Sequence, residues 1–187
     1  MSRLNHNGMD NLRHGRASVP NGRYFITICT KGRQVDLNQG RVFRKVVESL
    51  REMHLNSDIY LYCATIMPDH LHLLYRLGES LKLGQIQAKL KSQTRESLNA
   101  EGFLWQDNYY DHYLREDDAL EGFAKYIYLN PHVKRLISLD SDWPYWLLNR
   151  DYKPEFIDLV ESCGGVPEEW VASAMSANDL IESYRRV

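Results

Sequence analysis

The sequence predicts an α+β fold in which helices pack on an antiparallel sheet. Three observations predict it. Short segments rich in β-branched and aromatic residues occur along the chain, two of them flank a tight turn, and segments with helical spacing of apolar residues separate the others. The resulting order of elements, β-α-β-β-α-(β)-α, is typical of a sheet covered by helices.

The first half of the chain predicts three strands and one helix. The strands are expected at residues 23–30 (RYFITICT), 58–67 (DIYLYCATIM) and 70–76. The helix is expected at about 41–54, because its apolar residues follow a helical spacing at Val42, Val46, Leu50 and Met53. Pro68 and Asp69 form a tight turn between the second and third strands, so these two strands are expected to pair as a hairpin.

The second half predicts two longer helices, at about 81–99 and 116–130, with a short strand between them inside 102–115 (GFLWQDNYYDHYLR). Proline disfavours α geometry in the residue before it, so Pro131 is expected to end the second helix at Asn130. Beyond Leu139, one last helix is expected after a Gly-Gly break, with Pro167 near its start.

The composition indicates a single globular domain. The 187 residues suffice for one well-packed core, and 43% hydrophobic with 26% charged residues is ordinary for a soluble protein. No apolar run approaches the length of a membrane span, and the first residues lack the apolar core of a secretory signal. Three cysteines without paired spacing fit free thiols in a reducing compartment. We therefore expect a cytoplasmic protein.

Charge is distributed unevenly along the chain, although the net charge is only −2. Residues 1–137 carry 19 Lys and Arg against 15 Asp and Glu, whereas residues 138–187 carry 4 against 10. A basic body with an acidic end can bind a polyanion, but uneven surface charge without functional meaning explains the pattern equally well. We divide the chain into a flexible basic arm (1–20), a main domain (21–150) and an acidic C-terminal extension (151–187) of unknown role.

Two histidines stand one residue apart in IMPDHLHLL, within the third predicted strand. Side chains alternate along a strand, so His70 and His72 point to the same face of the sheet, where two neutral imidazoles can share one cation. The same short pattern also fits two partly exposed histidines with hydrogen-bonded rings. No H-E-x-x-H or C-x-x-C motif supports a zinc hydrolase or a zinc finger. His112 can reach the pair or pack on neighbouring aromatic rings, and we favour packing.

The helix predicted from EDDALEGFAKYIYLNP has one tyrosine well placed for chemistry. Its apolar stripe, which would face the sheet, consists of Leu120, Phe123 and Ile127. Tyr126 and Asn130 lie four residues apart on one flank of that stripe, whereas Tyr128 is expected to point outward on the other flank. A phenol beside a bound cation can attack a phosphate, and an asparagine oxygen suits Mg²⁺ or Mn²⁺. By itself, the segment also fits an amphipathic helix with an interfacial tyrosine and a capping asparagine.

Four segments together resemble a known family. In this order and spacing, IMPDHLHLL, KLKSQTRESLN, LWQDNYYDHYLR and KYIYLNP resemble the REP-associated tyrosine transposases, which are HUH endonucleases related to the transposases of single-stranded insertion sequences. The likeness runs from about Arg23 to Leu136. The family usually continues after Asn-Pro with a Val-Arg-Ala-Gly-Leu type of run, whereas this chain has HVKRLI. This puts the turn after the helix in doubt, but not the nucleophile. The acidic extension resembles no part of the family and is expected to be specific to its lineage.

The resemblance implies a ferredoxin-like core and a Mg²⁺ or Mn²⁺ ion held by His70, His72 and the side chain of Asn130. It also implies that Tyr126 is the nucleophile, which attacks a DNA phosphodiester, forms a 5′-phosphotyrosine and releases a 3′-hydroxyl. Proteins of this family recognise repetitive extragenic palindromes folded as single-stranded hairpins and cut beside them. The implied partner is therefore single-stranded or hairpin DNA, and we expect the chain to act as a monomer or a homodimer.

Further basic and aromatic residues are expected to contact DNA. Basic side chains neutralise phosphates, and aromatic rings stack on unpaired bases. The expected contacts are Arg13, Arg16, Lys82, Lys89, Lys91, Arg95, Trp105 and Tyr109, with Tyr24 and Tyr110 as further stacking positions. The Lys91-Ser92 pair stands where the family has a similar pair. Taken singly, each of these residues is more often a solvated charge or a core aromatic.

Two other functions fit the same motifs. The first is a domesticated hairpin-binding protein that no longer cuts DNA, and the second is a metal-dependent phosphohydrolase that uses water and leaves no protein–DNA adduct. The complete H-x-H and Y-x-x-x-N sets favour the cleaving and joining enzyme, because binding alone does not require them.

Overall fold

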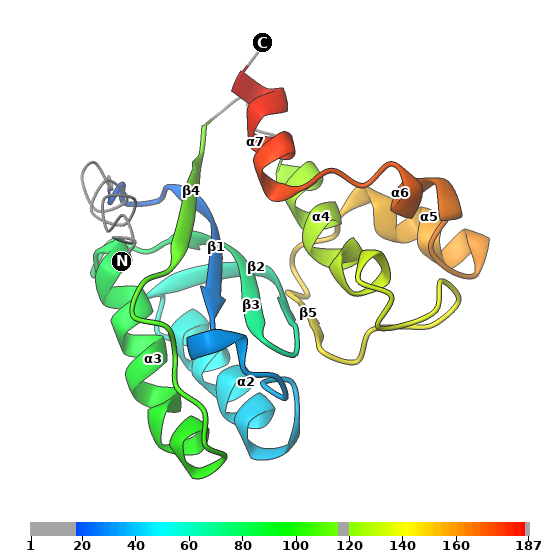
Figure 1. Cartoon of the computed structure of the whole chain (residues 1–187). Helices are drawn as coiled ribbons and strands as arrows, with labels where there is room; N and C mark the ends of the chain where they lie inside the picture. The colour runs from blue at the N-terminus through cyan, green and yellow to red at the C-terminus, as the bar shows by residue number, and fades with distance from the viewer. Residues whose placement is uncertain (1–17, 116–119, 186–187) are drawn as a thin grey trace, which may run out of the picture.

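The computed structural model describes residues 18–115 and 120–185, and it shows one sheet with helices on both faces (Figure 1). The strands are β1 (Arg23–Cys29), β2 (Ile59–Ile66), β3 (His70–Leu77), β4 (Tyr110–Leu114) and β5 (Trp146–Leu148). They lie in the order β4-β1-β3-β2-β5, and every neighbouring pair is antiparallel. The predicted hairpin is formed by β2 and β3.

The helices described are α2 (Gly40–Leu55), α3 (Leu83–Ala100), α4 (Leu120–Val133), α5 (Glu155–Cys163), α6 (Glu168–Ala172) and α7 (Ala177–Arg185), with a short 3₁₀ turn, η1 (Lys31–Arg33). Helix α2 connects β1 to β2, and α3 connects β3 to β4. With the order β4-β1-β3-β2 in the sheet, this is the ferredoxin-like arrangement, so the predicted α+β fold is confirmed. None of the described helices is long and apolar enough to cross a membrane.

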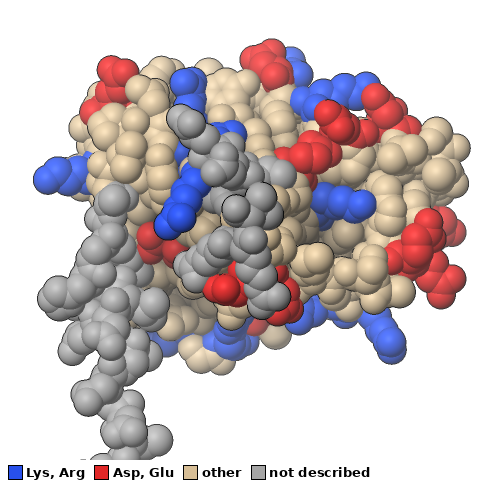
Figure 2. Space-filling model, turned by 90° about the horizontal axis from the view of Figure 1, so that it is seen from above, with Lys and Arg blue, Asp and Glu red and all other residues tan. Residues whose placement is uncertain are grey.

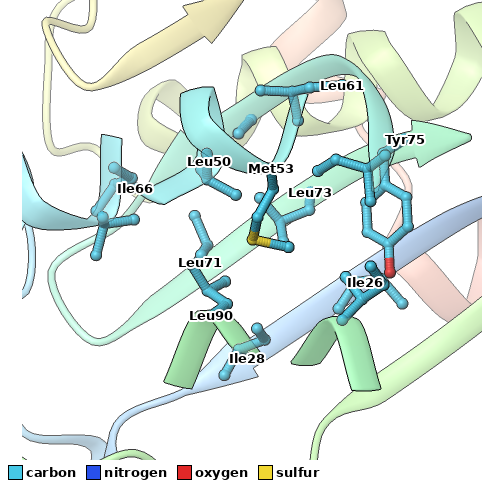
Figure 3. Packing of buried hydrophobic residues seen from close by; sticks show 14 of the residues in the cluster. Ile26, Ile28, Leu50, Met53, Leu61, Ile66, Leu71, Leu73, Tyr75 and Leu90 are labelled. Carbon is cyan, nitrogen blue, oxygen red and sulfur yellow. The ribbon is translucent and has the colours of Figure 1, made fainter. Parts of the chain in front are cut away.

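Helices α2 and α3 cover one face of the sheet, where the alternation of β1 and β3 places large apolar side chains. Figure 3 shows this core, in which Ile26 and Ile28 of β1 lie near Leu71 and Leu73 of β3. Leu50 and Met53 of α2 and Leu90 of α3 close it from the helix side. Burying each such side chain stabilises the fold by about 1.5–3 kcal/mol.

Helix α4 covers the opposite face, which carries the intervening residues of the same strands. Phe25 of β1 and Leu74 of β3 pack there with Phe123 and Ile127 of α4, and all four side chains are buried. The apolar stripe predicted for this helix is therefore confirmed. The C-terminal helices extend the same cluster through Phe156, Val160, Leu180 and Ile181. Residues 151–185 thus pack on α4 rather than standing apart from the main domain.

The structure corrects two expectations about α4. Pro131 does not end the helix, because α4 continues through it to Val133. Proline cannot donate a backbone N–H to the carbonyl four residues before it, but Pro131 is buried, and the backbone N–H of Lys134 donates to the carbonyl of Asn130, which continues the helical pattern past it. Tyr128 does not point outward either. Its ring is buried against Trp146 of β5 and Phe156 of α5. The sequence had predicted no regular structure for either of these two elements.

Candidate functional site

Alternation along β3 places the two histidines side by side on the face covered by α4. Thr27 pairs with His72, and Cys29 pairs with His70. The Nε2 atoms of the two imidazoles face each other at 3.1 Å, and the rings meet edge to face. Exposed fractions of 9% for His70 and 4% for His72 show that both are buried rather than partly exposed.

Each imidazole is oriented by a hydrogen bond at its other nitrogen. Nδ1 of His70 lies 2.5 Å from Oδ1 of Asp69, and Nδ1 of His72 lies 2.8 Å from Oγ1 of Thr27. A carboxylate can only accept, so His70 donates from Nδ1, and Thr27 can accept from His72 in the same way. In these tautomers both Nε2 atoms carry a lone pair and can bind one cation, whereas in the other tautomer of His72 its Nδ1 accepts from Thr27 and its Nε2–H donates to Nε2 of His70.

Burial keeps both rings neutral. It lowers the pKa of His72 well below its usual value, and it lowers the pKa of His70 against the opposing effect of the Asp69 carboxylate. The neutral imidazole is the form that binds metal ions. Two ligands at right angles around an octahedral ion, each at about 2.1 Å, lie about 3.0 Å apart. The observed separation of 3.1 Å therefore fits a shared cation.

Tyr126 and Asn130 approach the histidines from α4, as the helical spacing predicts. The ring of Tyr126 lies 5.5 Å from the ring of His72 and stands edge-on to Phe25. Burial raises the pKa of the Tyr126 phenol, whereas a hydrogen bond with the Asn130 side chain lowers it. An asparagine that donates its amide N–H to the phenol keeps its oxygen for another partner. Asn130 is itself buried.

These groups line one cavity of about 460 Å³ between the sheet and α4. Its walls include His70, His72, Tyr126 and Asn130, so the structure brings together all four residues that the motifs singled out. Other segments complete the lining. They contribute Thr27, Cys29, Arg33, Gln106, Asn108, Tyr109, Tyr110, Lys134, Ala177 and Asn178.

Two cations in this cavity were not predicted from the sequence. Lys134 and Arg33 both line it, and their positive charges contribute to lowering the pKa of both histidines. Arg33 also forms an ion pair with Asp69, its Nη1 lying 3.1 Å from Oδ2. Lys134 stands four residues after Asn130, so the Tyr126–Asn130 spacing extended by one turn would have found it. Ending the helix at Pro131 hid this signal. Arg33 has no comparable signal in the sequence.

The other predicted DNA contacts are dispersed. Lys89 and Arg95 belong to α3 and Lys82 is the residue before it, on the sheet face opposite the histidines. Nζ of Lys89 lies 2.6 Å from the Asp58 carboxylate. Nζ of Lys91 lies within 2.6–3.3 Å of the carbonyl oxygens of residues 106, 107 and 108, and so supports a loop that lines the cavity. Arg13 and Arg16 lie outside the described residues.

Only some of the aromatic residues predicted to contact DNA lie at the cavity. Tyr109 and Tyr110 line the cavity, whereas Trp105 donates its indole N–H to Oγ1 of Thr94. Tyr24 is fully buried in the α2–α3 core, so its prediction as a base-stacking residue is wrong. The strand period explains this, since Tyr24 faces the opposite side from Phe25. His112 stacks on Phe123, which confirms the preference for packing.

The donor set is that of a hard or borderline cation. Among the described residues, no third His, Cys, Asp or Glu joins the pair to form a metal cluster, and the side-chain amide of Asn130 is one of the oxygen donors that line the same cavity. Imidazole nitrogens, an amide oxygen and positions left open suit Mn²⁺ or Mg²⁺ more than a structural zinc ion, which takes four protein ligands.

A ferredoxin-like sheet with an H-x-H pair facing a helix-borne tyrosine defines the class of tyrosine transposases that the sequence resembles. Residues 18–130, more than half of the chain, match the model of the family described as Transposase IS200 like. The chain belongs to this family. Its assignment as a transposase, and hence as an enzyme, is confirmed.

Sequence similarity to known proteins extends beyond residues 18–130. The chain is 28% identical over 177 residues to a Haemophilus influenzae protein assigned to the REP-associated tyrosine transposases, with 86% of this chain and 96% of that protein covered. It is 21% identical over 140 residues to the REP-associated tyrosine transposase of Escherichia coli K12, with 73% and 82% covered.

A solved structure supports the fold over almost the whole chain. It is described as a REP-associated tyrosine transposase bound to a REP hairpin, and it matches with a TM-score of 0.64 over 94% of both chains at 18% identity. A match of this extent includes most of residues 151–187. The expectation that the acidic extension is specific to its lineage stays a prediction.

Proposed function

We propose that the protein cleaves and rejoins single-stranded DNA beside palindromic hairpins, with Tyr126 as the nucleophile and a 5′-phosphotyrosine as the intermediate. One observation carries the proposal. The phenol of Tyr126 lines the same cavity as the paired imidazoles of His70 and His72, with its ring 5.5 Å from that of His72.

The covalent step exchanges one phosphorus–oxygen bond for another. The Oη atom of Tyr126 forms a bond to the scissile phosphorus and loses its proton to solvent, while the bond from phosphorus to the 3′ oxygen breaks and that oxygen leaves as a hydroxyl after taking up a proton. Attack by a 3′-hydroxyl on the phosphotyrosine reverses the exchange and joins two DNA ends. The tyrosine ester preserves the phosphodiester's reactivity between the two steps.

His70, His72 and Asn130 are the proposed holders of a divalent cation, Mg²⁺ or Mn²⁺. When bound, such an ion polarises the phosphoryl oxygens and offsets negative charge that develops during attack. Arg33 and Lys134 add fixed positive charge to the same cavity. Burial raises the pKa of Tyr126, so the phenol is a weak nucleophile by itself and depends on this positive environment.

The substrate class rests on the relatives and on the lining of the cavity. The solved structure described above is of a transposase bound to a REP hairpin. Here the cavity is open to solvent at Tyr110 and is lined by Tyr109 and Tyr110, rings on which unpaired bases can stack. The dimensions of the cavity, about 460 Å³, suit one or two nucleotides of a single strand rather than a duplex.

The decisive experiment traps the covalent intermediate. The protein is incubated with Mn²⁺ or Mg²⁺ and labelled hairpin oligonucleotides that carry single-stranded flanks, and an adduct stable in SDS is sought by gel electrophoresis. Tyr126→Phe is expected to abolish the adduct and to leave hairpin binding intact, and EDTA is expected to abolish the adduct as well. Tyr128→Phe is the matched control, because it removes a hydroxyl from the same helix on the side turned away from the histidines.

The two alternative functions give different results in the same experiment. A hairpin-binding protein that has lost cleavage forms a complex but neither adduct nor cleaved strand. A phosphohydrolase yields cleaved strand without adduct. An adduct that persists in Tyr126→Phe, or that is lost in Tyr128→Phe, contradicts the assignment of the nucleophile.

A further inference from the structure

The face of the sheet that carries the candidate site continues beyond α4. Successive pairs on this face of β1 and β3 are Thr27 with His72, Phe25 with Leu74, and Arg23 with Arg76. The first pair belongs to the candidate site, and the second is buried under α4. The third lies at the far end, where Arg76 is exposed and Arg23 is partly exposed. The helix that closes the site therefore leaves this end of the sheet open.

The two arginines at this end are direct partners in the register of β1 and β3. Within residues 18–115 and 120–185, neither guanidinium has a carboxylate at salt-bridge distance. Arg23 instead donates to the backbone carbonyl of Arg115, at 3.2 Å. Like charges directly opposite each other on neighbouring strands destabilise a sheet. An anion bound between the guanidinium groups removes this repulsion, and two guanidinium groups match the oxygens of a phosphate.

Two tyrosines of the neighbouring strand β2 lie beside the arginine pair. Tyr60 pairs with Arg76 across the strands, and the guanidinium carbon of Arg76 lies 5.5 Å from the centre of the Tyr60 ring. The ring of Tyr62 lies 5.2 Å from that of Tyr60. Burial raises the pKa of Tyr62, and the positive charges of Arg76 and Arg23 oppose this effect, which places both charges near its phenol. Both tyrosines are partly exposed.

We infer that these four residues, Arg23, Arg76, Tyr60 and Tyr62, form a second DNA contact that holds the single strand flanking the hairpin. We call them the Arg–Tyr patch. Guanidinium groups that bind backbone phosphates, combined with rings that stack on bases, are the features of a site for single-stranded nucleic acid. Viewed from above, at the end where β1 begins, basic and acidic side chains are both visible near the middle of the molecule, and acidic ones are frequent on the right (Figure 2).

The distance between the candidate site and the Arg–Tyr patch predicts how many nucleotides are needed to span them. Four residues separate Thr27 from Arg23 along β1, and the same number separates His72 from Arg76 along β3, a distance of about 13 Å at ~3.3 Å per residue. A stacked strand advances ~3.4 Å per nucleotide. A strand that leaves the candidate site therefore needs about four nucleotides to reach the patch. The inference rests on the proposed function, because it takes the same DNA as the ligand of both sites.

The test measures binding as a function of flank length. Hairpin oligonucleotides with 5′ or 3′ flanks from zero to about ten nucleotides are titrated with the wild-type protein and with the Arg23→Gln/Arg76→Gln variant. With flanks longer than about four nucleotides on one side, the variant is expected to bind about tenfold more weakly at low salt. The slope of log K against log salt is expected to fall by about 1.4, or ~0.7 for each lost phosphate contact. With shorter flanks the two proteins are expected to bind equally.

Two further variants of the chain serve as controls. Arg44→Gln/Arg51→Gln removes the same charge from exposed positions on α2, across the sheet from the patch, and is expected to leave the flank dependence unchanged. Arg76→Gln alone retains the hydrogen bond of Arg23, and it is expected to weaken long-flank binding about threefold even if the double variant folds poorly. Melting curves identify any loss of fold.

The possible outcomes separate this inference from the proposed function. Equal binding at every flank length on both sides overturns the inference. A loss of the same size with and without a flank also overturns it, because the patch then contacts the hairpin stem. Adduct formation on short-flank substrates is measured in parallel. Its absence in the wild type contradicts the proposed function, whereas its presence in the double variant shows that the candidate site is intact.

Discussion

The Nε2 atoms of His70 and His72 lie 3.1 Å apart, and each ring is fixed at Nδ1 by a neighbour of its own. Two unprotonated nitrogens at this distance repel each other through their lone pairs unless a proton or a cation lies between them. Burial lowers the pKa of both rings, so it opposes a second proton on either ring, but it does not oppose the neutral tautomer in which one Nε2–H donates to the other Nε2. The proposed cation would take the place of a proton shared by the two Nε2 atoms, and the groups behind the imidazoles would then determine how well the cation is held.

The first prediction concerns Asp69, which orients His70. Asp69→Asn replaces a carboxylate that accepts from Nδ1 by a neutral amide, and it also removes the ion pair with Arg33. Partners behind a metal-binding histidine typically contribute 10–100-fold to metal affinity, so we expect Mn²⁺ to bind roughly 10–100-fold more weakly. Titration calorimetry on the protein without DNA measures this directly. Asp158→Asn, which breaks an exposed ion pair on α5, is the control, and equal Mn²⁺ affinity in both variants contradicts the assignment.

The second prediction concerns Lys134, whose charge enters the cavity that holds Tyr126. We expect Lys134→Gln to slow adduct formation ~10-fold at low salt. This is less than the ~10²–10³-fold effect of a preorganised donor to a developing oxyanion, because Lys134 is exposed and its charge is partly screened. The neighbouring Arg135→Gln removes the same charge from a residue that does not line the cavity. Similar rates for the two variants would show that only overall charge matters.

The third prediction concerns the cysteines. Cys63 is fully buried between the sheet and the α4–α5 layer, and burial raises its pKa well above the usual value. Cys163 is exposed at the end of α5. The thiolate is the reactive form, so we expect an aromatic disulfide reagent to modify Cys163 within minutes and Cys63 only after unfolding. Rapid modification of Cys63 in Cys163→Ser would indicate that the C-terminal helices do not cover the sheet as described.

The sequence predicted the positions of those site residues that a strand period or a helix period determines. Alternation along a strand placed His70 and His72 on one face, and helical spacing placed Tyr126 and Asn130 on one flank of α4. Both patterns are local, so neither depended on knowing the rest of the fold. The central strands were found for the same reason, since their β-branched and aromatic residues are continuous.

The predictions were wrong or missing where contacts with a segment distant in the sequence outweigh the local sequence pattern. Proline disfavours helix before it, yet Pro131 is buried within α4, which continues to Val133, and this continuation brings Lys134 to the cavity. Tyr128 has the spacing of an exposed residue, but Trp146 and Phe156 cover it. Arg33 reaches the histidines through Asp69, a contact set by the fold of β1 against the β2–β3 turn. No pattern within one segment contains such information.

The last prediction measures how firmly the C-terminal helices are attached. Phe156 and Leu159 lie on the same helix, but Phe156 is buried against Tyr128 whereas Leu159 is 54% exposed. We expect Phe156→Ala to lower the free energy of unfolding by about 3–5 kcal/mol, through lost burial and the cavity that remains, and Leu159→Ala to change it by less than ~0.5 kcal/mol. Urea denaturation measures both. Since Ala177 and Asn178 of α7 form part of the site wall, a stability loss of the same small size in the two variants would mean that this wall is only loosely held, and would remove the structural basis for including α7 in the site.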